Sequence, residues 1–519
     1  MVFNHDSRKK NILRSSLFGA VSYILTMALG LGYRVFFLRI LTVEYLGING
    51  LFSNILSLLG LAELGIADAI IYRLYEPLST EDTHRVGELM TFFRKTYCLI
   101  AAVIFSLGCA VCPFLKGLIR DSGEIPGDTN IYVVYLLLLI QTSSTYLFAY
   151  KLSLLNADQK KYQTTAISAI NTLVRYTCQI LVLQITKSYT VTLASGIIVT
   201  ITVNWLAGKW VEKKYPHVFN VRSDLSTNEK KDIRKDTAAA LLHKIGGTIV
   251  TSTDNILLSK FIGLAITGIY SNYALIISGV SGMIGSVLGS LAPSLGNAHV
   301  TLDNAARYRI FRRAFFLNLW IAGLCGCCLY NLINDFIVLW LNKNLFLDPL
   351  TVFFLCLLFY LESVRSVNIS YTMSCGLFTK DRIRPVIESA LNIMISIVGL
   401  KTIGTAGIFL GTILSNLCTV FWREPYLLYK YAFQQKLRNY WWIYFLNMIM
   451  TAGAALISQR LKYLLFGETI SIMTWIACGI ISVCVYTAIH SLFFFRSDDY
   501  RYFIHLKFRE AMKRSRNHG

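Results

Sequence analysis

The stretch from Arg34 to Leu51, RVFFLRILTVEYLGINGL, decides the fold. It holds the end of one apolar segment, a short turn and the start of a second apolar segment. A similar pattern returns 221 residues later, from Asn255 to Asn272, as NILLSKFIGLAITGIYSN. Gly47 then coincides with Gly268, and most other positions pair an apolar residue with an apolar residue. The repeat predicts a chain of two related halves, with the substrate site where the halves meet.

The composition is that of a membrane protein. Of the 519 residues, 55% are hydrophobic and only 15% are charged, and the mean hydropathy is +0.52. Apolar runs of about 20 residues recur along the chain, which is the length that crosses a bilayer. We read no removable signal peptide, because the first apolar run lacks a small-residue cleavage site. The net charge of +21 does not indicate nucleic acid, since the basic residues lie in the gaps between apolar runs.

The twelve cysteines suggest neither a metal site nor redox chemistry. The pairs Cys109/Cys112 and Cys325/Cys328 have CxxC spacing, but both lie inside apolar segments without a nearby His or Asp. We interpret them as small apolar residues. No metal and no cofactor are therefore expected.

Fourteen membrane spans are predicted, so both ends of the chain lie on the same side. The segments assigned to the inner side then hold most of the 50 Lys and Arg residues, which places both termini in the cytoplasm. The predicted spans are Leu13–Ile40, Leu46–Tyr72, Tyr97–Leu115, Ile131–Leu155, Thr164–Ile185, Val191–Trp210, Ala238–Ile262, Gly268–Leu295, Ala314–Leu339, Leu350–Leu377, Val386–Leu400, Ala406–Leu428, Trp441–Ile457 and Ile470–Phe495.

The repeat organises these spans into an all-α integral membrane protein with about 14 transmembrane helices. Residues 1–225 are predicted to form an N-terminal six-helix lobe, and residues 226–435 a second, pseudo-symmetric six-helix lobe. Residues 436–519 add two further helices and a basic cytoplasmic tail. Both lobes begin on the inner side, so the repeat is parallel rather than inverted.

Ionisable and polar residues inside the first and seventh spans are candidates for a binding site. An ionisable group deep in a span costs roughly 2.5–3.5 kcal/mol on insertion scales, so it normally faces water or a partner. Arg34 fits either a cavity role or an interfacial anchor. Asn255 is its counterpart in the repeat, and the adjacent Asp254 fits either a cavity or a buried structural pair.

Two other spans carry similar groups. Arg175 lies in the middle of the fifth span without a local acid, so a substrate anion or a distant carboxylate such as Glu63 is expected to face it. Glu362 and Arg365 are three residues apart on one face of the tenth span. They fit an internal ion pair or a role in the lumen. Arg34, Arg175, Arg365 and Asn255 are therefore the candidate substrate-binding residues, and Asp254, Glu362 and Glu63 the candidates for ion coupling.

Motifs for enzymatic chemistry are missing from the sequence. It contains no GxxxxGK[ST] phosphate loop, no HExxH and no GxSxG. No predicted loop is long enough to form a soluble catalytic domain. We expect no catalytic residues and no enzyme activity.

Two phrases resemble a known family. EYLGINGLFSNILSLLGLAELGIADAIIYRLYEPLSTED, from Glu44 to Asp82, resembles the start of bacterial polysaccharide transporters, the Wzx-type flippases. TDNILLSKFIG, from Thr253 to Gly263, resembles the opening of their seventh span. These transporters belong to the superfamily of multidrug/toxin exporters of the MATE type and lipid II flippases.

The resemblance implies a V-shaped pair of six-helix lobes in the bacterial cytoplasmic membrane. It implies the flipping of undecaprenyl-pyrophosphate-linked oligosaccharide to the outer leaflet for O-antigen, capsule or exopolysaccharide synthesis. Its partners would be the lipid-linked glycan, membrane lipids, a polysaccharide polymerase and other assembly proteins, with H+ or Na+ as a coupling ion. Arginine suits the cargo because guanidinium groups form paired hydrogen bonds with phosphate.

Three alternatives stay open. A drug or cation antiporter of the MATE type predicts a lumen dominated by acids rather than arginines. A lipid II flippase is compatible with the same residues. A membrane-embedded polysaccharide polymerase or glycosyltransferase predicts a large outer loop with clustered acids or histidines, and the sequence has no such loop.

Overall fold

A computed structural model describes the backbone of residues 5–63, 66–121, 124–221, 223, 225–289, 303–375, 377–381 and 383–503. Within these ranges every regular element is a helix, as the sequence predicts. Twelve described helices are long and apolar enough to cross a membrane, and a shorter apolar helix, α2 (Val43–Leu59), accompanies them. The fold class is therefore an all-α, multi-pass membrane protein.

The chain divides into two compact units, Met1–Ala274 with Asp381–Ser415, and Leu275–Lys380 with Asn416–Gly519. These units are defined by packing, whereas the predicted lobes are defined by the repeat. The lobe boundaries at residues 225 and 435 stay a prediction.

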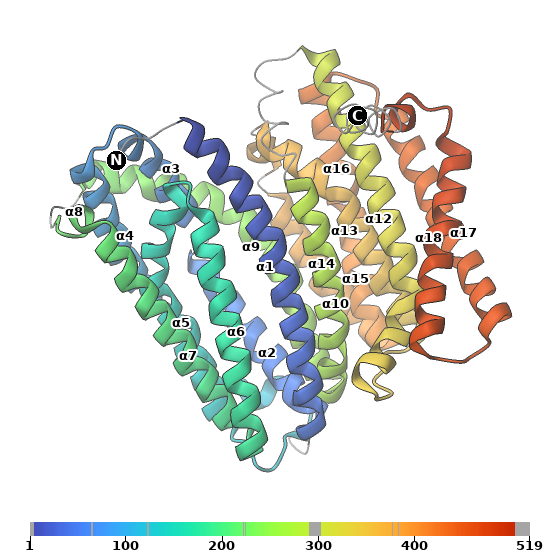
Figure 1. Ribbon diagram of the computed structural model, residues 1–519, viewed down its shortest axis with the longest axis horizontal. Coiled ribbons are helices and arrows are strands. Elements are labelled where there is room, and N and C mark those ends of the chain that lie inside the picture. The colour runs from blue at the N-terminus through green and yellow to red at the C-terminus, as the bar shows by residue number, and fades with distance from the viewer. Residues whose placement is uncertain are drawn as a thin grey trace, which may run out of the picture. The chain divides into compact units, whose positions relative to one another are not determined.

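The first unit contains the helices that carry most of the candidate residues. In Figure 1, α4, α5 and α7 run side by side within it. Its other close pairs are α1 with α6, α2 with α9, and α9 with α14. The bounds are α1 (His5–Ile40), α3 (Ile66–Ser79), α4 (Thr83–Val111), α5 (Ile131–Ala157), α6 (Lys161–Thr186), α7 (Tyr189–Lys214), α8 (Pro216–Phe219), α9 (Thr227–Phe261), the first part of α10 (Leu264–Gly289), α14 (Arg384–Ile403) and most of α15 (Thr405–Cys418).

The second unit is built around α12 (Asn304–Leu341), which packs against α13 (Pro349–Ser374), α17 (Arg438–Phe466) and α18 (Ile472–Phe494). α16 (Val420–Leu427) packs against α13. Buried polar side chains link these helices. Asn318 donates to the carbonyls of Ser363 and Val364, and the Tyr360 hydroxyl donates to Asn447 at 3.0 Å. The buried amides of Asn318 and Asn447 thus have protein partners, which removes much of the cost of burying them.

One predicted span is interrupted. The expected single helix Leu46–Tyr72 is replaced by α2, a short 3-10 turn over Gly60–Glu63, and α3. Gly60 forms the C-cap of α2, and glycine lowers helix stability by about 1 kcal/mol relative to alanine. The predicted span Ala238–Ile262 corresponds to α9, which begins earlier at Thr227 with a capping box between Ser226 and Glu229.

The repeat is visible in how equivalent helices begin. Asp82 caps α4 by accepting a hydrogen bond from the Arg85 amide, and Asp303 caps α12 by accepting one from the Ala306 amide. Residues 82 and 303 differ by the same 221 positions that relate Gly47 to Gly268. Two helix starts that are related by the 221-residue shift therefore carry the same kind of cap.

The turn between α9 and α10 is held by the segment that follows α4. Gly263 adopts a φ of 130°, which only glycine takes up readily. The Glu124 carboxylate accepts from the Leu264 amide at 2.5 Å, and the Arg120 guanidinium donates to the Ile262 carbonyl at 3.0 Å. These contacts fix the start of α10, which carries the residues described next.

Candidate functional site

The starts of α2 and α10 cross at the two repeat glycines. A Cβ atom added to Gly47 would collide with the Leu264 carbonyl oxygen, and one added to Gly268 would collide with the Val43 carbonyl oxygen. The two contacts are related by the 221-residue shift, because Val43 is the counterpart of Leu264. The repeat thus brings equivalent turns of its two halves together within the first unit.

Arg34 reaches from α1 to the helix that follows this crossing. Its guanidinium donates to the Ser271 hydroxyl at 2.7 Å and to the Asn272 side-chain oxygen at 2.6 Å. Asn272 is fully buried, and the Ser271 hydroxyl in turn donates to the Gly268 carbonyl at 2.6 Å. Both acceptors of Arg34 are neutral. Among the side chains that the structure describes, no carboxylate pairs with this charge.

Arg175 joins the same neighbourhood through a pair of stacked tyrosines. Tyr33 of α1 stacks on Tyr176 of α6 with ring centroids 4.8 Å apart and planes 21° apart. The Arg175 guanidinium lies 4.4 Å from the centroid of the Tyr176 ring, a cation–π distance. Tyr33 lies within electrostatic range of both Arg34 and Arg175. Two of the arginines predicted from the sequence are therefore brought together.

Unsatisfied buried amides accompany these cations. Among the described residues, the Asn272 side-chain nitrogen and the Asn171 side-chain oxygen have no hydrogen-bond partner. Asn171 lies four residues before Arg175, on the same face of α6. A buried polar atom without a protein partner costs free energy unless water or a ligand satisfies it. The arrangement is suited to binding a hydrated, anionic group.

Asn255 is placed differently from Arg34. Its side-chain amide lies over Gly50 of α2, at 3.8 Å from the position of an added Cβ, and its oxygen has no hydrogen-bond partner among the described residues. Gly50 is the counterpart of Ser271 under the 221-residue shift, so Asn255 and Arg34 approach equivalent positions. Its role as a substrate-binding residue stays a prediction.

The ion-coupling candidate Asp254 is buried in α9, with 6% of its surface exposed. A polar chain begins beside it, since the Thr253 hydroxyl donates to the Asn392 oxygen at 3.4 Å. The Asn392 amide then donates to the Thr412 hydroxyl at 2.8 Å. Hydrogen bonds between polar side chains thus link α9, α14 and α15 in the first unit.

The Arg34 cluster consists of Arg34, Arg175, Tyr33, Tyr176, Ser271 and Asn272. The contacts described for the remaining candidates involve other residues. Arg365 forms a two-pronged ion pair with Glu424 of α16, at 2.8 Å and 3.2 Å, and Glu424 is buried. Glu362 is exposed on α13. Glu63 ends the turn after α2, and its side chain lies outside the described residues.

Sequence reasoning missed Tyr33, Tyr176, Ser271, Asn272 and Glu424. Ser271 and Asn272 close the quoted repeat stretch, and two polar residues one turn after Gly268 in an apolar span were the available signal. Glu424 is an acid inside a predicted span, and the insertion cost that singled out Glu362 applies to it equally. The tyrosines gave no signal, because aromatic residues in a membrane helix usually face neighbouring helices.

Several solved structures have a similar fold. No protein-family model and no curated protein matches the chain. The structure of lipid II flippase MurJ in an inward closed conformation matches with a TM-score of 0.66 and 14% identity, covering 92% of this chain and 99% of that one.

Two transporters also match. An inward-facing multidrug resistance MATE family transporter of the MOP superfamily gives 0.58 and 13%, covering 80% of this chain and 96% of that one. A MOP superfamily transporter from Pyrococcus furiosus, with a binding pocket described as reversed in polarity, gives 0.54 and 10%, covering 79% and 93%. At these identities the matches show the fold that the chain shares with a flippase and with transporters.

Proposed function

We propose that the chain is a flippase for undecaprenyl-pyrophosphate-linked oligosaccharide. It would carry the repeat units from the inner to the outer leaflet of the bacterial cytoplasmic membrane by alternating access. The observation that supports this most directly is that Arg34 and Arg175 lie near the same pair of stacked tyrosines. No described carboxylate pairs with either arginine. An unpaired charge in a membrane helix needs a counter-ion, and the pyrophosphate of the cargo supplies one.

The chemistry of the cluster fits the two parts of the cargo. Guanidinium groups bind phosphate oxygens through paired, charge-assisted hydrogen bonds. Buried amides such as Asn171 and Asn272 can exchange hydrogen bonds with sugar hydroxyls, which are costly to bring into hydrocarbon unpaired. The prenyl chain can stay in the bilayer throughout. Arg365 is less suited to this role, because Glu424 already neutralises it.

The driving force in this proposal has two parts. A cargo with about two negative charges moving outward is favoured by about 2.3 kcal/mol per charge for each 100 mV of membrane potential. Cation antiport through Asp254, with Glu362 and Glu63 as further candidates, would add to it. Asp254→Asn should then remove any dependence of transport on a proton or sodium gradient while cargo binding persists, and unchanged gradient dependence would leave Asp254 as a structural residue.

Lipid II is the second candidate cargo. It carries the same pyrophosphate, and the fold similarity to lipid II flippase MurJ supports it. A cationic drug, the cargo of a MATE-type antiporter, suits the two arginines poorly.

Reconstitution separates these cargoes. The purified chain is placed in proteoliposomes with undecaprenyl-pyrophosphate-linked oligosaccharide, lipid II or a cationic dye, and the appearance of each at the opposite leaflet is measured. We expect transfer of a pyrophosphate-linked glycan, and loss of that transfer in Arg34→Gln. Transport of the dye alone would overturn the proposal.

A further inference from the structure

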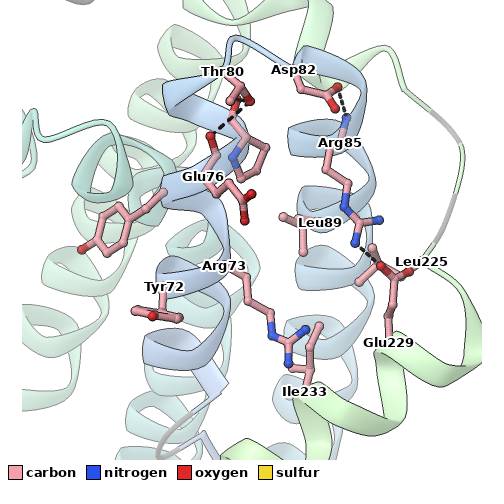
Figure 2. Close-up of a pocket in the computed structure, with 12 residues that line it drawn as sticks. Tyr72, Arg73, Glu76, Thr80, Asp82, Arg85, Leu89, Leu225, Glu229 and Ile233 are labelled. Atoms are coloured by element: carbon pink, nitrogen blue, oxygen red, sulfur yellow. Dashed lines mark hydrogen bonds and ion pairs between the residues drawn. The ribbon is translucent and has the colours of Figure 1, made fainter.

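A cavity of about 560 Å³ lies between α3, α4 and the start of α9 in the first unit. It is lined by Tyr72, Arg73, Tyr75, Glu76, Pro77, Thr80, Asp82, Arg85, Leu89, Leu225, Glu229 and Ile233. None of these residues belongs to the Arg34 cluster. Figure 2 shows Arg73 and Arg85 reaching into this space from neighbouring helices, with Glu229 facing Arg85. We call it the Arg85 cavity.

Glu229 accepts hydrogen bonds from Arg85 on one carboxylate oxygen and from Ser226 on the other. The Arg85 guanidinium donates to the Glu88 carboxylate at 2.9 Å and also to one oxygen of Glu229. The other Glu229 oxygen accepts from the Ser226 hydroxyl at 2.7 Å and from the Ser226 amide at 3.1 Å. If Arg85 turned away, Glu229 would keep its capping box and Arg85 would keep Glu88.

The link between Arg85 and Glu229 is therefore exchangeable. Each of the two side chains is 34% exposed. Water screens an ion pair that is exposed to this extent, so the pair contributes little to stability. Arg85 and Ser226 lower the pKa of Glu229 to about 2, so the carboxylate is fully ionised at neutral pH. An incoming anion would therefore compete with the ionised Glu229 carboxylate for Arg85, and its binding would not require Glu229 to change its protonation state.

The rest of the lining suits a group that arrives from a membrane surface. Tyr72 and Tyr75 are exposed, at 76% and 46%, and tyrosine is enriched where a membrane meets water. Leu89, Leu225 and Ile233 provide apolar contact beneath the charged groups. Glu76 and Asp82 also line the cavity, but both are exposed and screened by water, and the Asp82 carboxylate accepts a hydrogen bond from the Arg85 amide. The sequence predicts that this end of the helices is cytoplasmic.

We propose that the Arg85 cavity is a second binding site, which receives a phosphate-bearing headgroup at the cytoplasmic surface. A phosphate oxygen takes the place of Glu229 on Arg85, and Arg73 is a second guanidinium that lines the same cavity. The exchange frees the first turn of α9 from α4 and so ties anion binding to movement of that turn. Only the identification of the headgroup with the flippase cargo rests on the proposed function.

Calorimetric titration of the full-length chain in detergent with inorganic pyrophosphate tests this site. Glu229→Gln removes the competitor and should strengthen binding about tenfold, since a hydrogen bond to a charged group contributes on that order. Arg85→Gln should weaken binding at least about tenfold, with Arg85→Lys in between because it keeps charge but loses the fork. Arg94→Gln on α4 and Asp232→Asn on α9 lie outside the lining and should leave the affinity unchanged.

Equal affinity in the wild type, Glu229→Gln and Arg85→Gln would overturn the site. A parallel titration with a short prenyl diphosphate identifies the source of the anion. Tighter binding than inorganic pyrophosphate, with the same ranking of variants, assigns a lipid-linked headgroup. Equal binding of the two assigns a soluble phosphate and rejects the lipid source.

The two proposals fail separately. Arg34→Gln should lose transport yet keep pyrophosphate binding at the Arg85 cavity. Normal transport by Arg34→Gln, with the ranking of the Arg85 and Glu229 variants intact, would refute the role of Arg34 in cargo binding and leave the second site supported. Loss of transport in Arg34→Gln, with equal pyrophosphate affinities in the Arg85 and Glu229 variants, would support the role of Arg34 and refute the second site.

Discussion

Replacing Arg34 tests whether its charge serves the fold or the cargo. The guanidinium makes two hydrogen bonds, at 2.7 Å and 2.6 Å, to neutral oxygens. Hydrogen bonds of charged groups contribute about 1.5–3 kcal/mol each, so their loss would destabilise the protein by roughly 3–6 kcal/mol. Removing a charge from a membrane helix recovers about 2.5–3.5 kcal/mol, and the amide of glutamine can replace one of the donors. Arg34→Gln should therefore unfold close to the wild-type temperature.

The effect on transport should be much larger. The loss of one paired contact with a phosphate corresponds to about 1.5–3 kcal/mol, or a ten- to hundredfold fall in apparent affinity. Arg34→Lys keeps the charge but loses the paired N–H donors of the guanidinium group, and it should retain part of the activity.

The assay is complementation of surface polysaccharide in a deletion strain, with membrane abundance and thermal unfolding of each variant measured alongside. Full export by Arg34→Gln at normal abundance would refute the binding role. A large fall in unfolding temperature with export in proportion to abundance would instead make Arg34 a structural residue.

Three further predictions concern other contacts. Gly268→Ala should destabilise the protein by about 1–3 kcal/mol, because its Cβ would meet a backbone carbonyl, whereas Gly453→Ala, with open space around it, should be neutral or stabilising in thermal unfolding. Glu424→Gln should cost about 3 kcal/mol, because it leaves the partly buried Arg365, with 16% of its side chain exposed, beside a neutral side chain. Replacing both residues by leucine should recover most of that stability, and equal losses in the single and double variants would contradict the reasoning. The ratio of pyrophosphate affinities between Glu229→Gln and the wild type should stay constant from about pH 5.5 to about pH 8.5. The lowered pKa of Glu229 keeps the carboxylate ionised, and so competing for Arg85, above the ordinary carboxyl range, and this competition is lost only toward about pH 2. An affinity ratio that declines as the pH drops below neutral would count against the exchange of Glu229 for the anion.

The helices were predictable because the physical constraint on them is local. A bilayer demands apolar runs of a fixed length, and the 221-residue repeat fixes which runs are equivalent. The break after α2 was not predicted, since a glycine inside a strongly apolar run does not by itself indicate the end of a helix. Gly60 ends the helix only together with the turn that follows it.

The candidate site was predictable in its arginines but not in their partners. Insertion cost identifies an arginine as significant from a single span, whereas its acceptors are a tertiary property. Ser271 lies 237 residues from Arg34, and Glu424 lies 59 residues from Arg365. Proximity in sequence favoured Glu362 as the neighbour of Arg365, yet the ion pair that the structure shows reaches across to another helix.

The repeat also shows that the two arginines that lie near Tyr33 and Tyr176 belong to the first half only. Arg34 has Asn255 as its counterpart, and Arg175 has Ser396. Both arginines of the cluster are thus replaced by neutral residues in the second half. An anion site that occurs in only one half suits the proposed cargo, which carries a single pyrophosphate.

The same shift relates Tyr33 to Asp254. Where the first half has an aromatic ring that stacks beside Arg175, the second half has a buried acid next to the polar chain of Asn392 and Thr412. The two halves therefore carry their charges at different positions, with cations at Arg34 and Arg175 in the first half and a buried carboxylate at Asp254 in the second. Under the proposed function, the pyrophosphate of the cargo would meet Arg34 and Arg175, and a coupling cation would meet Asp254. The two ions would then share no protein group, so a cation gradient would drive transport without competing with the cargo for the guanidinium groups.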